Sequence, residues 1–192
     1  LEGVGEKPVN AAAAPFRPVM LSHAIDDADF GKLDPDDFVA ERKWDGIRVQ
    51  ATAARGVRRL YSPTVDDIAA AFPSLVDRPS LDGATHGELL VARPDSDSVA
   101  IGTFSDLQQR LNRKTVTPRM LREHPAFVRL YDPFFVAGED IPAVPFAERR
   151  RRLDAWGASQ RPPLTAVSER VSREGFAQRR ATRAVYYTHL TL

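Results

Sequence analysis

A lysine stands close to carboxylates, a glycine and an arginine in the run Glu41-Arg42-Lys43-Trp44-Asp45-Gly46-Ile47-Arg48. Apolar, strand-like residues flank this run, so Lys43 could be held at the mouth of a pocket as a nucleophile. An ammonium group is not a nucleophile, and a lysine that attacks phosphorus must first lose its proton. Magnesium and an arginine such as Arg48 would stabilise the charge that develops on the phosphoryl oxygens. The run predicts covalent nucleotidyl transfer, with solvent-facing strand residues beside a plain turn as the alternative.

Two further runs carry candidate site residues. The first is His86-Gly87-Glu88-Leu89-Leu90-Val91, in which Glu88 could accept a hydrogen bond from a ribose hydroxyl or hold a metal at a strand end. The second is Arg129-Leu130-Tyr131-Asp132-Pro133-Phe134-Phe135, in which Tyr131 could stack on a purine and Asp132 could fix a neighbouring backbone. An ordinary turn glutamate and a core tyrosine are the alternatives that the spacing leaves open.

Short strands and helices are expected to position these residues. Residues 37–43 read as a strand, Asp45-Gly46 as a hairpin turn, and residues 47–53 as the partner strand. Acidic residues open a short helix over residues 66–72 that Pro73 ends. Buried strands are expected over residues 81–92 and 128–136.

Two longer helices are also expected. Ser105 and Gln108 could form a capping box for the first. The second begins at Pro145, ends at Gly157, and carries Phe146, Leu153 and Trp156 on one side. Its run Arg149-Arg150-Arg151-Arg152 is interpreted as a solvated face, because four consecutive residues point around most of a helix.

Composition limits the remaining classes. The chain has 192 residues with 43% hydrophobic content, enough for one sizeable core. It has no cysteine and four scattered histidines, which makes a structural zinc site very unfavourable. No apolar run approaches the roughly 18 residues of a membrane helix, so a soluble, intracellular protein is expected. Lys and Arg exceed Asp and Glu by 7 in residues 101–192 and fall short of them by 6 in residues 1–100, a distribution consistent with a polyanion-binding second half.

Taken in order, these runs resemble the adenylation domain of ATP-dependent DNA ligases, in particular the bacterial type related to the eukaryotic replicative ligases. The run around Lys43 is similar to the first nucleotidyltransferase motif, Gly87-Glu88-Leu89-Leu90 to the third, and Tyr131-Asp132-Pro133-Phe134 to the F-D-L-L segment. The run from Phe104 to Lys114 resembles a helix that such ligases carry there. The resemblance covers roughly residues 15–184.

The resemblance implies a role for each matching residue. Lys43 would form lysyl-AMP from ATP, and AMP would then pass to the 5′-phosphate of a DNA nick. Glu41 would recognise the adenine amino group, Arg48 would contact the ribose or phosphates, Glu88 would bind the ribose and support Mg2+, and Tyr131 would stack on adenine. The implied fold is α+β, an ATP-grasp-like nucleotidyltransferase domain with antiparallel sheets flanked by helices.

Nicked duplex DNA is the implied partner, and a monomeric, cytoplasmic, nucleoid-associated bacterial protein without membrane contact is expected. Sequence-independent contacts to the DNA backbone are expected from a basic group that consists of Arg110, Arg113, Lys114 and Arg119.

The chain also departs from the family pattern. Ser62-Pro63-Thr64-Val65 stands where the family reads S-R-x-G, and His86-Gly87-Glu88 stands where it reads D-G-E. The E-G-x-x-x-K fourth motif, the fifth motif and the OB-fold domain are missing, so an incomplete domain with impaired sealing is expected. Residues 1–14 read as a linker from a missing N-terminal domain and residues 185–192 as an extraneous tail.

Two other functions stay open. An RNA ligase or RNA-capping guanylyltransferase would share the lysine motif, and nucleotide choice would separate it from a DNA ligase. A non-catalytic remnant that binds nucleotide or DNA would show binding without covalent labelling.

Overall fold

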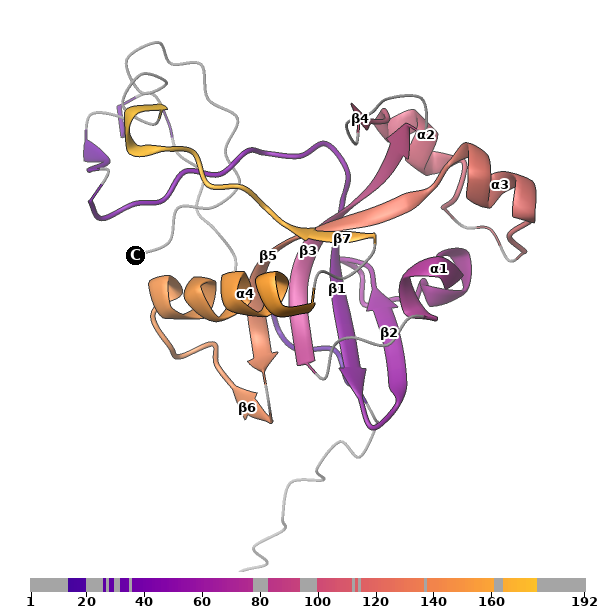
Figure 1. Cartoon of the computed structure of the whole chain (residues 1–192), viewed down its shortest axis with the longest axis horizontal. Helices are drawn as coiled ribbons and strands as arrows, with labels where there is room; N and C mark the ends of the chain where they lie inside the picture. Colours follow the sequence, from indigo (N-terminus) through magenta and orange to yellow (C-terminus); the bar gives the residue numbers. More distant parts are fainter. Residues whose placement is uncertain are drawn as a thin grey trace, which may run out of the picture.

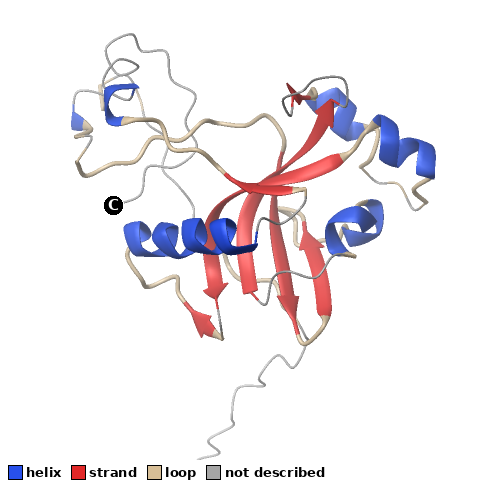
Figure 2. Ribbon diagram, viewed as in Figure 1, coloured by secondary structure: helices blue, strands red, loops and turns tan. Residues whose placement is uncertain are grey.

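A seven-stranded sheet forms the centre of the molecule, with helices packed against it (Figures 1 and 2). The computed structural model describes residues 14–19, 26, 28–29, 32–34, 36–77, 83–93, 100–111, 113, 115–136, 138–160 and 164–175. The strands are β1 (Ile47–Ala54), β2 (Val57–Tyr61), β3 (Gly83–Arg93), β4 (Ala100–Ile101), β5 (Ala126–Val136), β6 (Glu139–Asp140) and β7 (Thr165–Val167). The helices are η2 (Ala69–Ala71, a 3-10 turn), α1 (Pro73–Val76), α2 (Phe104–Gln108), α3 (Pro118–Glu123) and α4 (Phe146–Gln160).

The strand order is β2-β1-β3-β5-β6, with β4 paired to β3 and β7 paired to β5. Pairs within this path are antiparallel, whereas β5 and β7 run parallel. This α+β architecture confirms the expected fold class. The two buried strands expected from the sequence are also confirmed as β3 and β5. β3 begins two residues later than predicted and β5 begins two residues earlier.

The hairpin lies one strand later than predicted. Residues Arg55 and Gly56 join β1 to β2, with φ angles of 53° and 77°, which match a two-residue turn with two left-handed positions. The hairpin predicted at Asp45-Gly46 is therefore wrong, although the strand predicted after it is confirmed as β1. Residues 37–43 also do not form the predicted strand, and an isolated bridge between Glu41 and Arg170 is the pairing that the structure gives them.

The hydrophobic core lies between the sheet and helices α1, α2 and α4. Alternate residues of the three central strands, such as Val49, Leu89 and Val128, face Leu153 of α4 in this core. Because side chains alternate across a strand, Arg48, Glu88 and Arg129 belong to the opposite face. The sheet thus separates an apolar face from a face that carries the candidate site residues.

Helix α4 confirms the predicted start after Pro145 and the predicted apolar side, but it does not end at Gly157. It continues to Gln160, and Gly157 instead allows close packing: a Cβ there would lie 2.6 Å from Cγ2 of Val167 in β7. Arg149 and Arg150 are buried, so the interpretation of the whole arginine run as a solvated face is wrong. Only Arg151 and Arg152 of that run lie outside the buried set.

The short helices differ from the prediction in their boundaries. Pro73 opens α1 rather than only closing the preceding turn, as proline at a first helical position allows. The capping box of α2 is formed by Thr103 and Asp106 and not by Ser105 and Gln108. The Thr103 backbone N–H donates to Asp106 Oδ2 at 2.7 Å, and the Asp106 N–H donates to Thr103 Oγ1 at 3.3 Å.

Several predicted features lie wholly or partly outside the residues that the structure describes. Lys114, residues 1–13 of the predicted linker and the predicted tail at residues 185–192 lie outside the described residues. Ala14 is described and buried, and its carbonyl oxygen accepts from Thr52 Oγ1 at 3.0 Å and from the Tyr61 hydroxyl at 3.1 Å. In the part of the chain that the structure covers, no helix has the length and apolar character needed to cross a membrane.

Candidate active site

Lys43 lies on a segment, residues 36–46, that begins at a turn, ends at a bend and lies outside the strands of the sheet. This segment lies beside residues 168–171, as the adjacent purple and yellow traces show (Figure 1). The Val171 backbone N–H donates to the Ala40 carbonyl oxygen at 2.8 Å, and Glu41 bridges to Arg170. The Lys43 side chain is exposed, which leaves its amino group accessible to a ligand.

Gly46 brings this segment onto strand β3. Its backbone N–H hydrogen-bonds the Glu88 carboxylate. A Cβ at position 46 would collide with the Leu89 carbonyl oxygen and would lie 2.8 Å from Cδ2 of Leu90. Glycine is required here by the close approach of two backbones, and not by a hairpin turn.

Glu88 lies at the centre of a row of charged residues. It is directly paired with Arg48 of β1 on one side and with Arg129 of β5 on the other. Burial raises the pKa of Glu88 to about 7, and the Gly46 N–H, Lys43 and Arg48 act in the opposite direction. These interactions place Lys43, Arg48 and Glu88, three residues singled out from the sequence, in one electrostatic neighbourhood.

Tyr131 lies beside this row at an irregularity in the β3–β5 pairing. The ladder shifts register between His86 and Gly87, and the Tyr131 ring makes an edge contact with the His86 ring at 6.4 Å. Burial raises the pKa of the Tyr131 hydroxyl, while Arg48 opposes the shift by its charge and a hydrogen bond. Tyr131 is therefore near Arg48 and Glu88, as predicted, but only 5% of its surface is exposed.

Gly87 permits the close approach of β3 and β5 at this irregularity. A Cβ at position 87 would lie 2.8 Å from the Arg129 carbonyl oxygen and would also collide with Val128. The glycine next to Glu88 is thus explained by packing between strands. His86, which stands where an aspartate was expected, is buried, with its ring nitrogen 2.9 Å from Nε2 of Gln50.

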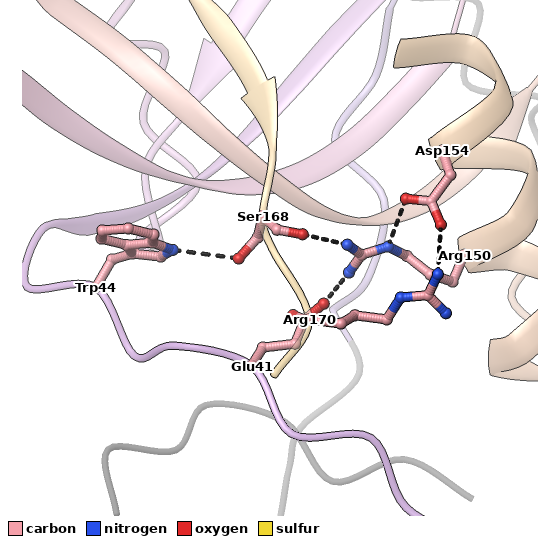
Figure 3. Close-up of polar contacts among 6 residues, drawn as sticks. All are labelled: Glu41, Trp44, Arg150, Asp154, Ser168 and Arg170. Carbon is pink, nitrogen blue, oxygen red and sulfur yellow. Dashed lines mark hydrogen bonds and ion pairs between the residues drawn. The ribbon is translucent and has the colours of Figure 1, made fainter. Parts of the chain in front are cut away.

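Glu41 has a different environment from the exposed carboxylate that adenine recognition suggests. It is buried, with 3% of its surface exposed, and forms an ion pair with Arg150 of α4. Arg150 also donates to the Ser168 carbonyl oxygen and, from Nε, to Asp154 at 3.0 Å (Figure 3). Burial lowers the pKa of the Arg150 guanidinium, and its hydrogen bond to Asp154 opposes that effect.

Arg150 and Ser168 were missed by sequence reasoning, although one signal was present. Arg149 lies three residues after Phe146 and four before Leu153, and Arg150 lies four residues after Phe146 and three before Leu153. The helical period therefore places both arginines on the apolar stripe. A charged residue on such a stripe is expected to have a buried partner. Ser168 gave no comparable signal.

Asp132 is held by the other buried arginine of α4. Arg149 donates from Nε to Oδ1 at 2.8 Å and from Nη2 to Oδ2 at 3.1 Å. Its Nη1 donates to the Val144 carbonyl oxygen at 2.6 Å. Burial raises the pKa of Asp132, and Arg149 opposes this rise. The predicted role of Asp132 in fixing a neighbouring backbone is therefore exerted through Arg149.

The predicted DNA-contacting residues separate into two kinds. Arg110 is fully buried and donates to the His124 carbonyl oxygen at 2.8 Å and to the Ala71 carbonyl oxygen at 2.7 Å, so its prediction as a surface contact is wrong. Arg113 and Arg119 are exposed, with Arg119 paired to Glu123 at 2.7 Å. Arg110 differs from them because its guanidinium is buried and donates to two backbone carbonyl groups.

The turn that departs from S-R-x-G has a backbone suited to glycine. Val65 occupies the glycine position of that pattern, has a φ of 68°, and is 50% exposed. A branched residue is strained in this region of φ. Ser62 accepts a hydrogen bond from the Val65 N–H at 3.0 Å, so the turn closes in spite of the substitution.

Protein ligands for a resident metal ion are sparse. Among the described residues, no group of three or more His, Cys, Asp or Glu side chains could hold a metal ion. Glu88, with Asp45 nearby, is the carboxylate that faces the candidate site.

Comparison with known proteins gives a consistent family. The family model described as "ATP dependent DNA ligase domain" matches residues 19–183. A DNA ligase of Aeropyrum pernix is 35% identical over 153 residues, which are 78% of this chain and 25% of that protein. A probable DNA ligase of Koribacter versatilis is 34% identical over 159 residues, which are 79% of this chain and 27% of that protein.

Solved structures share the fold. The structure titled "mycobacterial DNA ligase D complexed with ATP and MES" has a TM-score of 0.60 and 21% identity, and the match covers 93% of this chain and 52% of that one. A structure from a study of Lig E DNA ligases has a TM-score of 0.53 and 16% identity, covering 91% of this chain and 60% of that one. The chain spans about a quarter of the length of the two curated relatives.

Proposed function

The chain belongs to the ATP-dependent DNA ligase domain family, an enzyme family, and we propose that Lys43 is its adenylylated nucleophile. In this proposal the Lys43 amino group attacks the α-phosphorus of ATP. A phosphoramidate bond forms between Nζ and phosphorus, the bond from the α-phosphorus to the bridging oxygen breaks, and pyrophosphate leaves. Lys43 releases its proton to solvent.

The observation that carries the proposal is the convergence of Lys43, Arg48 and Glu88 around Gly46. A lysine alone would be an ordinary exposed side chain. A lysine next to an arginine that can neutralise phosphoryl oxygens, and next to a carboxylate held by the loop that bears the lysine, is suited to phosphoryl chemistry.

The remaining roles follow from position on the same face of the sheet. Arg48 would contact the phosphates or ribose, and Glu88 would bind the ribose. Tyr131 would stack on adenine after Arg48 moves from its hydroxyl, because little of the ring is exposed. Glu41 would accept from the adenine amino group while Arg150 holds its carboxylate in place.

Magnesium is assigned to the substrate as its ATP complex. The described residues do not supply a three-ligand protein site, so no step in the proposal is routed through a resident ion. Glu88 would lie beside the ion that ATP brings.

Transfer of AMP to the 5′-phosphate of a nick, and sealing by attack of the 3′-hydroxyl with release of AMP, are proposed for the complete ligase. The chain covers a quarter of the length of its curated relatives, so for these 192 residues the proposal is confined to the first half-reaction. Arg113 and Arg119 would contact the DNA backbone without reading bases.

Covalent labelling tests the proposal. The purified protein is incubated with magnesium and ATP or GTP labelled at the α-phosphate, and acid-sensitive label on the chain is measured. We expect label from ATP that is lost in Lys43→Ala and retained in Lys32→Ala, which removes another exposed lysine. Label from GTP alone would favour a capping guanylyltransferase, and label from neither would refute adenylylation by this chain.

A further inference from the structure

We propose that Arg150 and Ser168 are positioning residues that hold the nucleophile segment, residues 36–46, from both sides of Lys43. This inference deepens the proposed function and rests on it for its catalytic consequence. Neither residue lies in the runs that the sequence singled out for chemistry. Arg150 is 109 residues from Glu41, and Ser168 is 124 residues from Trp44.

The nucleophile segment needs such support because it lacks a strand ladder. Its backbone meets residues 168–171 through the Val171-to-Ala40 hydrogen bond and the bridge from Glu41 to Arg170, and it meets β3 through the Gly46 N–H and the Glu88 carboxylate. A segment with so few backbone hydrogen bonds samples many conformations unless side chains fix it. The position of Lys43 therefore depends on side chains that flank it.

Arg150 fixes the residue two positions before Lys43. It reaches from α4 and uses one guanidinium edge for the Glu41 carboxylate and the Ser168 carbonyl oxygen, while its Nε meets Asp154 at 3.0 Å (Figure 3). Asp154 in turn accepts from Arg170 at 3.2 Å. Two cations and two carboxylates thus balance in a site where the Arg150 side chain is 2% exposed. A buried ion pair of this kind is rigid when each charge is matched.

Ser168 fixes the residue one position after Lys43. Its Oγ accepts from Trp44 Nε1 at 3.2 Å, on the same residue whose carbonyl oxygen accepts from Arg150 (Figure 3). The Trp44 ring also has two guanidinium groups near it, from Arg42 at 4.5 Å and from Arg129 at 5.1 Å. Ser168 is therefore the junction at which both supports of the nucleophile segment meet.

The consequence is a lysine with a fixed backbone and an accessible amino group. Holding a reacting group in place before the substrate arrives lowers the barrier to reaction, and a displacement of about 1 Å can cost about a hundredfold in rate. The junction acts through the backbone of residues 41–44, so it should affect the rate at saturating ATP more than the ATP concentration needed for half-saturation.

The test uses the full 192-residue protein with Ser168→Ala, Trp44→Phe and their double variant. Trp44→Phe keeps an aromatic ring but removes the five-membered ring that carries the indole N–H, and Ser168→Ala keeps the carbonyl oxygen that Arg150 uses. The matched control is Ser159→Ala, which removes an exposed hydroxyl bonded to the Trp156 carbonyl oxygen. The lysyl-AMP rate, the KM for ATP and amide hydrogen exchange over residues 38–46 are measured for each.

We expect each single variant to lower the rate at saturating ATP by about tenfold with little change in KM. The double variant should be no slower than the single variants, because both remove the same hydrogen bond. Exchange over residues 38–46 should accelerate in all three and stay unchanged in Ser159→Ala. A conservative Arg150→Lys, which keeps the charge but cannot make all of these hydrogen bonds, should show the slower rate and the faster exchange, and it should also raise the KM for ATP because it displaces Glu41.

Two results separate this inference from the proposed function. Parent-like rates and parent-like exchange in Ser168→Ala and Trp44→Phe would overturn the inference, whatever the activity of the parent. Faster exchange in the variants with no label on the parent would refute the proposed function and support the junction as the element that positions the segment. Additive losses in the double variant would also overturn the shared junction.

Discussion

Arg48 and Glu88 lie directly opposite each other on strands β1 and β3, and the pKa of Glu88 is nevertheless raised. Burial raises the pKa of Glu88 from 4.5 to about 7, and this effect exceeds the opposing effects of the Gly46 N–H, Lys43 and Arg48. The site therefore carries a carboxyl group that changes charge near neutral pH in the absence of ligand. Such a group is poised to respond to a cationic or hydrogen-bonding ligand.

The first prediction concerns folding stability against pH. In the unfolded chain Glu88 loses its proton near its ordinary value, whereas the folded chain keeps the proton until about pH 7. The contribution of Glu88 to the free energy of unfolding should therefore fall as pH rises through this window, by up to about 3 kcal/mol. Glu88→Gln should remove this fall. Urea unfolding at pH 4 and pH 8 measures it, with Glu123→Gln as an exposed control; parallel parent and Glu88→Gln profiles would contradict the shifted pKa.

The second prediction concerns the strained turn at Val65. Its φ of 68° suits glycine, so Val65→Gly should raise the free energy of unfolding by about 1 kcal/mol despite the greater entropy of glycine in the unfolded chain. Val65→Ala should gain less, because alanine keeps the Cβ clash. Thermal or urea unfolding compares the two variants. A Val65→Gly protein less stable than Val65→Ala would show that the turn is not strained.

The third prediction separates a structural arginine, Arg110, from Arg113, which is proposed to contact DNA. Arg110→Met should destabilise the fold by about 2 to 3 kcal/mol, because it leaves the Ala71 and His124 carbonyl groups buried without this donor. Arg113→Met should leave stability within about 0.5 kcal/mol, because Arg113 is exposed.

DNA binding should reverse the order of these two variants. Arg113→Met should weaken nicked-duplex binding equally for all sequences and reduce the dependence on log salt concentration by about one unit. Fluorescence anisotropy over a salt series measures the slope. An unchanged slope in Arg113→Met would exclude it from the DNA surface.

The fourth prediction concerns the buried pair of Asp132 and Arg149. Asp132→Asn should destabilise the fold by about 3 kcal/mol, because the Arg149 guanidinium would remain buried without its counter-charge. Asp140→Asn is the matched control, since Asp140 pairs with Arg17 but is 65% exposed, and its loss should cost less than about 1 kcal/mol. Equal losses in the two variants would argue against the buried pair. Unfolding in urea at pH 7 gives both values.

Local pattern was sufficient for three of the four expected strands and for the order of the candidate site runs. The apolar runs that contain Leu89 and Val128 indicated buried strands, and both residues lie in the core. The order of the three runs around Lys43, Glu88 and Tyr131 indicated the family, and the tertiary fold brings these runs together. Hydrophobic periodicity and short motifs are properties of neighbouring residues, so they are readable without the fold.

Local pattern failed where the same residue types fit more than one structure, as glycine fits both a turn and a close backbone contact. Asp45-Gly46 reads as a turn, yet Gly46 serves the contact with Leu89, and the turn lies at Arg55-Gly56. Ser105 and Gln108 fit a capping box, but the helix begins earlier, with Thr103 as its cap. The observed turn lies ten residues after the predicted one, and the observed cap lies two residues before the predicted one. Both positions depend on contacts that the fold gives to nearby backbone groups.

The sequence by itself determined the family resemblance, the buried strands and the α+β class, because those features follow from residues close in the chain. Only the tertiary structure decided which arginines are buried, that Glu41 is paired with Arg150, and that Trp44 is anchored by Ser168. These contacts join residues more than 100 positions apart, and their partners are set by strand order and by the placement of α4 on the sheet. A charge is stable in the interior only where the fold brings its counter-charge, and no local pattern specifies that meeting.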